Sequence, residues 1–317
     1  MVKLGFQLPN SGPLATAANL LEVARKAEAL AYDSVVVTDH IVIPWSIASR
    51  YPYSRSGRFS VPADGNYFEP LSLLSFVAGA TSRLRVGTSV MVVPYRNPVL
   101  SAKMLATLDV LSNGRLFVGV GSGWLAEEFT VMGSPPFAER GRATDEWLEI
   151  FVKLWTEPKP SFDGKLYRFA EVGCFPQPVQ KPHPPIYIGG NSRPALRRAA
   201  KYGQSWHAFR VPARELPRRL DYLESQRAAC GRERTGLGFS VRYGARVVAP
   251  LGDTNRRPGE EPERVFVGTA AEVAEQLKPV WALGPTDAIF DCRTGSLDEV
   301  TETMERLAGE VYPSLER

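Results

Sequence analysis

Short apolar runs recur along the chain, and each ends in polar or glycine residues. The clearest case is Ser34-Val-Val-Val-Thr-Asp-His40, which reads as a buried strand followed by an acid and an imidazole. Between these runs lie segments such as 16–31, where apolar side chains fall on one face and charged ones on another, as in a packed helix. Repetition of strand, polar loop and helix is typical of an α/β fold of the (β/α)8 TIM barrel type, whose chemistry sits at the C-terminal ends of the strands.

The periodicity predicts strands and helices in alternation along the chain. Strands are expected over 3–9, 34–38, 84–93, 115–120, 186–188, 204–209, 238–249 and 286–291. Helices are expected over 16–31, 70–81, 98–111, 142–155, 194–202, 213–229, 269–282 and 297–310. A polar loop rich in glycine and proline over 250–263 precedes the seventh helix. The short connections favour packing between consecutive elements.

Two long segments interrupt this alternation. Residues 41–69 contain prolines and glycines that break regular structure, but their many aromatic side chains argue against disorder. We interpret this segment as a lid on the substrate side, and Trp45 within it as a candidate substrate contact. In 158–184 the density of prolines excludes a regular helix, and we interpret this segment as an insertion compatible with a hairpin.

Length and composition limit the class of protein. The 317 residues suit one barrel domain, and the 44% apolar and 23% charged fractions are ordinary for a globular protein. No apolar run is long enough for a membrane span. The net charge of +4 comes with scattered arginine pairs, which gives nucleic-acid binding little support. Apolar helix faces are compatible with a homodimer.

The N-terminus and the cysteines indicate the compartment. The chain starts directly in a strand, without a signal-peptide pattern. Cys174, Cys230 and Cys292 are odd in number, far apart and without C-x-x-C spacing. We therefore expect a cytoplasmic protein with no disulfide framework and no zinc site.

His40 is the first candidate for chemistry because it directly follows the second strand. Imidazole titrates near neutral pH, so at a barrel mouth it would donate or accept a proton beside a redox ring. The alternative is a histidine that caps or holds the lid. Asp39 would either orient His40 or cap loop amides.

The segment Pro185-Ile-Tyr-Ile-Gly-Gly-Asn-Ser-Arg-Pro194 is the second candidate. Two glycines follow a strand, and Asn191 and Ser192 then open a helix. Such a turn presents backbone N–H groups where the helix dipole favours an anion, so Gly189, Gly190, Asn191 and Ser192 are candidates for binding a phosphate. A plain tight turn with a helix cap is the alternative.

Gly119-Val-Gly-Ser-Gly-Trp124 lacks the last glycine of a dinucleotide-binding G-x-G-x-x-G motif, so we exclude that fold. Gly121 and Ser122 would let the backbone approach a flat ligand, with Trp124 as a stacking wall; a tight turn with a packed aromatic is the alternative.

His207 would either line the same mouth as a substrate contact or be buried by strand alternation. No H-E-x-x-H, G-x-S-x-G or Cys–His pattern supports a hydrolase.

An ordered set of motifs carries a family resemblance. They are Thr38-Asp-His40, Gly87-Thr-Ser-Val90, Val93-Pro-Tyr-Arg-Asn-Pro98, Leu111-Ser-Asn-Gly-Arg115, Gly119-Val-Gly-Ser-Gly-Trp-Leu-Ala-Glu-Glu-Phe129 and Ile188-Gly-Gly-Asn191. Together they resemble the luciferase-like monooxygenase superfamily, and most of all its branch of oxidoreductases that depend on the deazaflavin coenzyme F420. The resemblance extends from residue 3 to about residue 210 and weakens beyond it.

The resemblance implies a bacterial luciferase-like barrel that holds a flavin or deazaflavin ring at its mouth. A non-proline cis peptide at Ser89-Val90 would back the ring, His40 would face its reactive side, and 189–192 would take its phosphate. Trp124 stands where sugar-phosphate dehydrogenases of this branch carry a catalytic glutamate, which argues against a sugar phosphate substrate. Ser122 stands where luciferase subunits place an arginine on the FMN phosphate, which disfavours that binding mode.

We therefore expect an F420-dependent oxidoreductase. A hydride would pass between C5 of the reduced deazaflavin and a small apolar or aromatic substrate, and His40 would handle the proton. An FMN-dependent monooxygenase that uses dioxygen is the second hypothesis. A deazaflavin-binding protein without catalysis is the third, suggested by the lack of a second strong acid or base.

Overall fold

A closed barrel of parallel strands forms the centre of the molecule. The computed structural model describes residues 1–232, 237–257 and 260–316. In this part of the chain eight strands close the barrel in the order β1 (Lys3–Gln7), β2 (Ser34–Val37), β3 (Arg85–Thr88), β5 (Leu116–Gly121), β8 (Ile186–Gly189), β9 (Ser205–Phe209), β10 (Gly238–Val248) and β12 (Asp287–Asp291), which pairs with β1. The predicted (β/α)8 barrel is confirmed.

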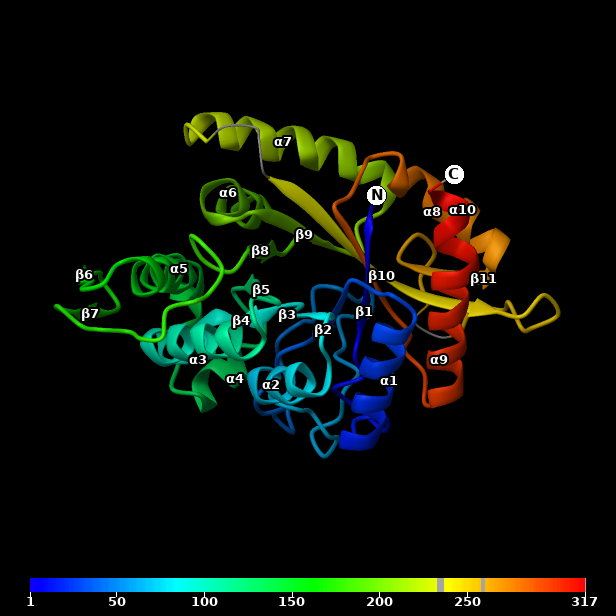
Figure 1. Cartoon of the computed structure of the whole chain (residues 1–317), viewed down its shortest axis with the longest axis horizontal. Helices are drawn as coiled ribbons and strands as arrows, with labels where there is room; N and C mark the ends of the chain where they lie inside the picture. Colours follow the sequence, from blue (N-terminus) through cyan, green and yellow to red (C-terminus); the bar gives the residue numbers. More distant parts are fainter. Residues whose placement is uncertain (233–236, 258–259, 317) are drawn as a thin grey trace.

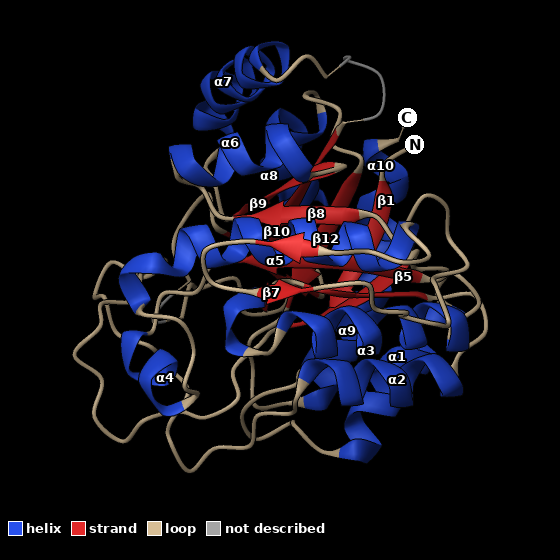
Figure 2. Cartoon of the chain, turned by 90° about the vertical axis from the view of Figure 1, so that its left-hand side faces the viewer, coloured by secondary structure: helices blue, strands red, loops and turns tan. Residues whose placement is uncertain are grey.

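Helices surround these strands (Figures 1 and 2). They are α1 (Ala17–Ala29), α2 (Pro70–Ala80), α3 (Pro98–Leu111), α4 (Ala126–Val131), α5 (Arg140–Thr156), α6 (Arg193–Tyr202), α7 (Leu216–Ala229), α8 (Ala270–Trp281), α9 (Leu297–Arg306) and α10 (Tyr312–Leu315). Every residue of β2 is buried, because its side chains face either the helices or the barrel interior. The chain ends meet where the Tyr312 hydroxyl donates to the Val2 carbonyl at 2.6 Å. In the described residues no helix is long and apolar enough to cross a membrane.

Two strands differ from the predicted pattern. The third predicted strand, 84–93, is interrupted after β3 and resumes as β4 (Met91–Val92), and the Ser89–Val90 peptide bond between them is cis, as expected. The second half of β10 pairs with β11 (Val265–Thr269), which the sequence analysis missed. β11 runs directly into Thr269, the N-cap of α8, so its short apolar run is not separated from the helical pattern. The predicted loop 250–263 includes 258–259, which lie outside the described residues.

The two long segments take different forms. In the 158–184 insertion, β6 (Phe162–Asp163) and β7 (Arg168–Phe169) form the antiparallel hairpin that the prolines allowed. The segment 41–69 contains neither helix nor sheet strand, apart from a single bridge between Tyr67 and Ser11. Its backbone is held from α4, a helix that was not predicted. Glu127 on that helix accepts hydrogen bonds from the N–H groups of Ala48 and Ser49 at 2.7 and 2.9 Å.

Candidate active site

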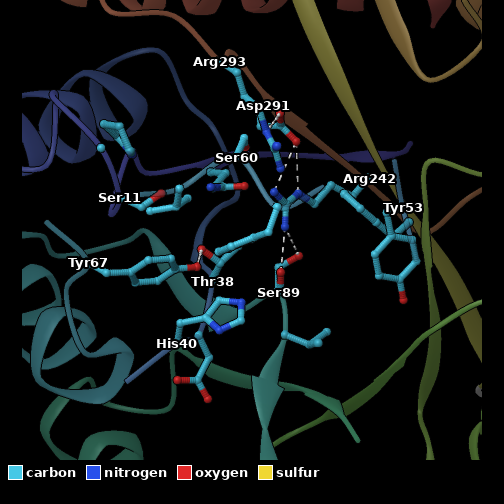
Figure 3. A pocket seen from close by; sticks show the side chains of 18 of the residues that line it. Ser11, Thr38, His40, Tyr53, Ser60, Tyr67, Ser89, Arg242, Asp291 and Arg293 are labelled. Atoms are coloured by element: carbon cyan, nitrogen blue, oxygen red, sulfur yellow. Dashed lines mark hydrogen bonds and ion pairs between the residues drawn. The ribbon is translucent and has the colours of Figure 1, made fainter. Parts of the chain in front are cut away.

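A cavity of about 500 Å³ opens where the barrel strands end. It is lined by residues that follow β2, β3 and β8, by the end of β12, and by aromatic residues of the 41–69 segment. Of the residues singled out in the sequence, the cavity lining includes Asp39, His40, Ser89, Val90, Trp124, Gly189, Gly190 and His207. Figure 3 shows His40 at one end of this cavity and Asp291 and Arg293 at the other, with Arg242 between them.

His40 is held by a buried carboxylate. Its Nδ1 lies 2.6 Å from Oε2 of Glu128, which also accepts the Tyr95 hydroxyl at 2.8 Å. Oε1 of Glu128 accepts the N–H groups of Ile41 and Val42 at 2.6 and 3.2 Å. An ionised carboxylate only accepts hydrogen bonds, so with Glu128 ionised Nδ1 of His40 is the donor. Among the described residues no group hydrogen-bonds Nε2 of His40, which leaves that nitrogen for a ligand.

Aromatic rings enclose His40 from the cavity side. Its ring centroid lies 4.8 Å from that of Phe59, 5.4 Å from that of Tyr67 and 5.9 Å from that of Trp124. Tyr51 completes this group, since its ring lies 5.0 Å from Trp124 and 5.3 Å from Phe59. We call Tyr51, Phe59, Tyr67 and Trp124 the aromatic cage. Three of its four members come from the 41–69 segment, so this segment packs against His40, as the lid interpretation requires.

Asp39 does not orient His40. Its carboxylate accepts two hydrogen bonds from the Arg96 guanidinium, at 2.8 and 3.0 Å, and one from the Val92 N–H at 2.8 Å. Arg96 also donates to Glu69 at 2.8 Å, so Asp39 belongs to a network that ties the end of β2 to β4 and α2. Neither alternative expected for Asp39 is met in full, because its partners are the Arg96 guanidinium and a single backbone N–H, which belongs to β4.

Val90 forms part of the cavity wall, and two glycines make room for it. A Cβ built on Gly189 would lie 2.6 Å from Cγ1 of Val90, and one on Gly121 would lie 2.7 Å from Cγ2. Both are closer than real Cβ contacts. Gly121 therefore lets a side chain approach, where we had expected it to let a ligand approach the backbone, and it is not part of the cavity lining.

The 189–192 turn is fixed by contacts to the next strand. The Asn191 side chain donates to the Phe209 carbonyl at 2.8 Å and accepts its N–H at 3.3 Å. Ser192 is the N-cap of α6, and its hydroxyl accepts the Ala195 N–H at 3.4 Å. Both side chains thus stabilise the turn, and its backbone N–H groups are the donors that it can present to an anion. Gly190, with φ of 100°, reaches the cavity itself.

His207 is buried in the cavity floor. Its Nε2 lies 2.7 Å from the Ser89 hydroxyl and its Nδ1 lies 2.6 Å from the Ser240 hydroxyl. Burial, with the charge of Arg242 adding to it, lowers the pKa of His207 to about 3. It is therefore neutral at physiological pH. The two alternatives expected for His207 both apply, because it is buried and it also forms part of the cavity wall.

Some predicted residues lie outside the cavity, and some of its residues were not predicted. Trp45 is 84% exposed, and it is absent from the lining together with Gly121, Ser122, Asn191 and Ser192. The sequence did not predict the cavity residues Arg242 and Asp291, or Glu128, which holds His40. Glu128 stands in the quoted motif that ends at Phe129, but the motif alone does not show which of its two glutamates is buried. Among the described residues no group of His, Cys, Asp or Glu side chains is arranged to hold a metal ion.

Comparison with known proteins identifies the family. Residues 2–299 match the model of the luciferase-like monooxygenase family. The chain belongs to this family. It is 30% identical to an uncharacterised protein of Mycobacterium tuberculosis over 292 residues, which cover 91% of this chain and 92% of that protein. This luciferase-like protein also shares its fold with an F420-dependent secondary alcohol dehydrogenase, at a TM-score of 0.80 with 18% identity and coverage of 99% of both chains.

Two further relatives of this luciferase-like protein carry names of enzymes. The F420-dependent glucose-6-phosphate dehydrogenase of Amycolatopsis mediterranei is 31% identical over 212 residues, which cover 65% of this chain and 57% of that enzyme. The FMNH2-dependent dimethylsulfone monooxygenase of Pseudomonas putida is 33% identical over 168 residues, which cover 52% of this chain and 46% of that enzyme. The family thus includes both deazaflavin and flavin enzymes, so a cofactor of this kind is consistent with membership.

Proposed function

We propose that this protein is a cytoplasmic F420-dependent oxidoreductase that exchanges a hydride between C5 of the deazaflavin and a small apolar or aromatic substrate. The observation that carries the proposal is His40, which is held through Nδ1 by Glu128 while Nε2 is left for a ligand within an aromatic cage. The relative from Amycolatopsis, which is named as an F420-dependent enzyme, supports this choice of cofactor.

The volume and the lining of the cavity support a flat ring with an anionic tail as its ligand. Its volume of about 500 Å³ falls in the usual range for small-molecule sites. Val90 offers an apolar surface on one side, and the cage offers aromatic faces on another. The wall at Gly189 and Gly190 has no side chains, so the backbone N–H groups that open α6 would hold the phosphate there.

The residues of this chain would supply position, proton transfer and exclusion of water. The bound deazaflavin would supply the hydride. Hydride addition to an electrophilic carbon of the substrate leaves negative charge on the neighbouring heteroatom. His40 would neutralise that charge by donating a proton from Nε2, and it would accept the proton there in the reverse reaction. Glu128 stabilises the protonated imidazole in either direction.

An FMN-dependent monooxygenase is the second candidate, because the relative from Pseudomonas putida is named as an FMNH2-dependent enzyme. The two hypotheses differ in their dependence on oxygen, since the deazaflavin ring lacks the nitrogen that makes oxygen activation easy in flavins. A deazaflavin-binding protein without catalysis is the third candidate. It predicts tight cofactor binding with no consumption across a broad panel of substrates.

Titration of the apoprotein with F420 and with FMN, followed by fluorescence at controlled ionic strength, tests the choice of cofactor. We expect F420 to bind more tightly, and a preference for FMN would favour the monooxygenase. Activity is then assayed anaerobically for His40→Ala, with His183→Ala as the matched control because His183 lies outside the cavity lining. A loss of about 10²-fold or more in kcat is expected for the first variant alone. Full turnover of His40→Ala with bound cofactor would contradict the proposed role of His40.

A further inference from the structure

Three guanidinium groups share one carboxylate at the end of the cavity away from His40. Asp291, the last residue of β12, lies 2.8 Å from Nη2 of Arg210, 3.2 Å from Nη2 of Arg242 and 3.3 Å from Nε of Arg293. Among the described residues it is the one carboxylate within ion-pair distance of any of the three. We call these four residues the arginine cluster, and it carries an excess of two positive charges.

This excess is costly because most of the cluster is buried. The side chains of Arg242 and Asp291 are 2% and 3% exposed, and that of Arg210 is 11% exposed. Burial alone would raise the pKa of Asp291, but the three guanidinium groups outweigh it and hold that pKa well below its usual range. Burial lowers the pKa of Arg242 to about 10, although Asp291 offsets part of the effect. A buried charge without a counter-charge is unfavourable unless a partner binds there.

The three arginines differ in what they can offer a ligand. Arg242 donates to Asp291 and, through Nη1, to the carbonyl and the hydroxyl of Ser89 at 2.6 and 3.0 Å, so its position is fixed. Arg210 also donates to Asp291, but it is not part of the cavity lining. Arg293 lines the cavity, and its side chain remains half exposed. It is therefore the arginine that can form a bidentate contact with a planar anion.

Aromatic surface continues from the arginine cluster to the aromatic cage. The guanidinium carbons of Arg242 and Arg210 lie 4.9 and 5.3 Å from the centre of the Phe209 ring. The Tyr51 hydroxyl interacts with Arg293, and its ring is packed against Trp124. A ligand that reaches from His40 to Arg293 would thus contact aromatic rings along its body and a cation at its end.

We propose that the arginine cluster is a subsite for a carboxylate group of the substrate, with Arg293 as the direct ligand and Arg210 and Arg242 as fixed charges behind it. This inference rests on the proposed function and narrows its substrate class from apolar or aromatic compounds to aromatic or apolar carboxylates. The phosphate tail of the cofactor is the other possible anion, and we assign it to the 189–192 turn. The experiment below measures substrate binding and cofactor binding separately, so it distinguishes the two anions.

Benzoate and benzamide are suitable probes because they have nearly the same shape and differ in charge. Each probe is titrated by calorimetry into the apoprotein. Each is also titrated into the protein loaded with whichever of F420 and FMN it binds more tightly. We expect benzoate to bind at least about tenfold more tightly than benzamide, and Arg293→Gln to abolish this preference. Arg293→Lys should keep part of it, and Arg218→Gln, an exposed arginine on α7, should keep all of it. F420 and FMN affinities of Arg293→Gln should stay within about twofold of the wild-type values.

Two results would overturn the subsite. The first is equal binding of benzoate and benzamide to the wild-type protein, a result that does not depend on the folding of any variant. The second is an undiminished preference in Arg293→Gln. If cofactor affinity fell in this variant at the same time, Arg293 would be assigned to the phosphate of the cofactor. Since calorimetry requires no turnover, the subsite can fail or hold independently of the F420-dependent reaction.

Discussion

The carboxylate of Glu128 lies 2.6 Å from Nδ1 of His40, and it is fully buried while it accepts hydrogen bonds from three further donors. Tyr95 and the two backbone N–H groups donate to this carboxylate, and in its ionised form it accepts from Nδ1 of His40 as well. The arrangement fixes the tautomer of His40 so that any exchange of protons with a ligand takes place at Nε2. Glu128 is thus a positioning residue whose effect is exerted through His40.

Glu128→Gln should lower kcat by about tenfold or more, because an amide has one acceptor oxygen for four donors and cannot hold the imidazole as before. Since Glu128 acts through His40, kcat should fall while KM stays within about twofold of the wild-type value. Steady-state kinetics measures this split between kcat and KM, which a purely structural role would not produce.

Glu127→Gln is the matched control for this prediction. Glu127 precedes Glu128 on α4, but its carboxylate binds lid amides at Ala48 and Ser49. Its replacement should leave kcat within about twofold of the wild-type value. If Glu128→Gln kept the kcat of the wild-type protein, Glu128 would have no positioning role.

Gly189→Ala should weaken cofactor binding by displacing Val90. The added Cβ would lie 2.6 Å from Cγ1 of Val90, so the side chain that forms part of the cavity wall must move. Overpacking of this kind typically destabilises a fold by about 1–3 kcal/mol, and a comparable loss of binding free energy would lower affinity by roughly tenfold to hundredfold. Fluorescence titration with F420 and FMN measures it. The double variant Gly189→Ala, Val90→Ala should recover part of the lost affinity, and no recovery would show that Val90 is not the cause.

Trp124 and Trp45 should differ in their effect on ligand binding. Trp124 packs against His40, Tyr51 and Phe59, whereas Trp45 is 84% exposed. We expect Trp124→Ala to raise KM by about tenfold through loss of aromatic contact, and Trp45→Ala to leave KM within about twofold. Steady-state kinetics of the two variants with one substrate decides the point. Equal effects would mean that the lid adopts another arrangement when a substrate binds.

The barrel could be predicted from the sequence because each strand is a short apolar run between clear helical patterns. β2 and β8 begin and end within one residue of their predicted limits. The prediction missed β11 and α4, which are short and adjoin stronger signals on either side. The expected single domain and homodimer remain predictions.

The site was predictable only in part, because its decisive contacts join residues that are far apart in the chain. His40 was found because it directly follows a predicted strand, whereas Ser89 and Val90 were expected only from the family resemblance. The arginine cluster was not, since nothing local marks Arg242 for a contact with Ser89, 153 residues away. The path of the lid likewise depends on long-range contacts, so Trp45 could not be distinguished from the aromatic residues that reach His40.

His207 should make stability depend on pH in the weakly acidic range. Its pKa in the folded protein is about 3, mainly because it is buried, whereas the unfolded chain should titrate near 6.5. Between these values the unfolded chain binds a proton that the folded protein does not. This contribution is therefore fully present above pH 6.5 and is lost at up to about 1.4 kcal/mol per pH unit as the pH falls toward 3.

The midpoint temperature of unfolding should fall less steeply from pH 7 to 5 in His207→Gln than in the wild-type apoprotein. His183→Gln is the control, since His183 is partly exposed, and it should follow the wild type. Parallel curves for all three proteins would mean that His207 titrates alike in the folded and unfolded states, which would contradict the lowered pKa.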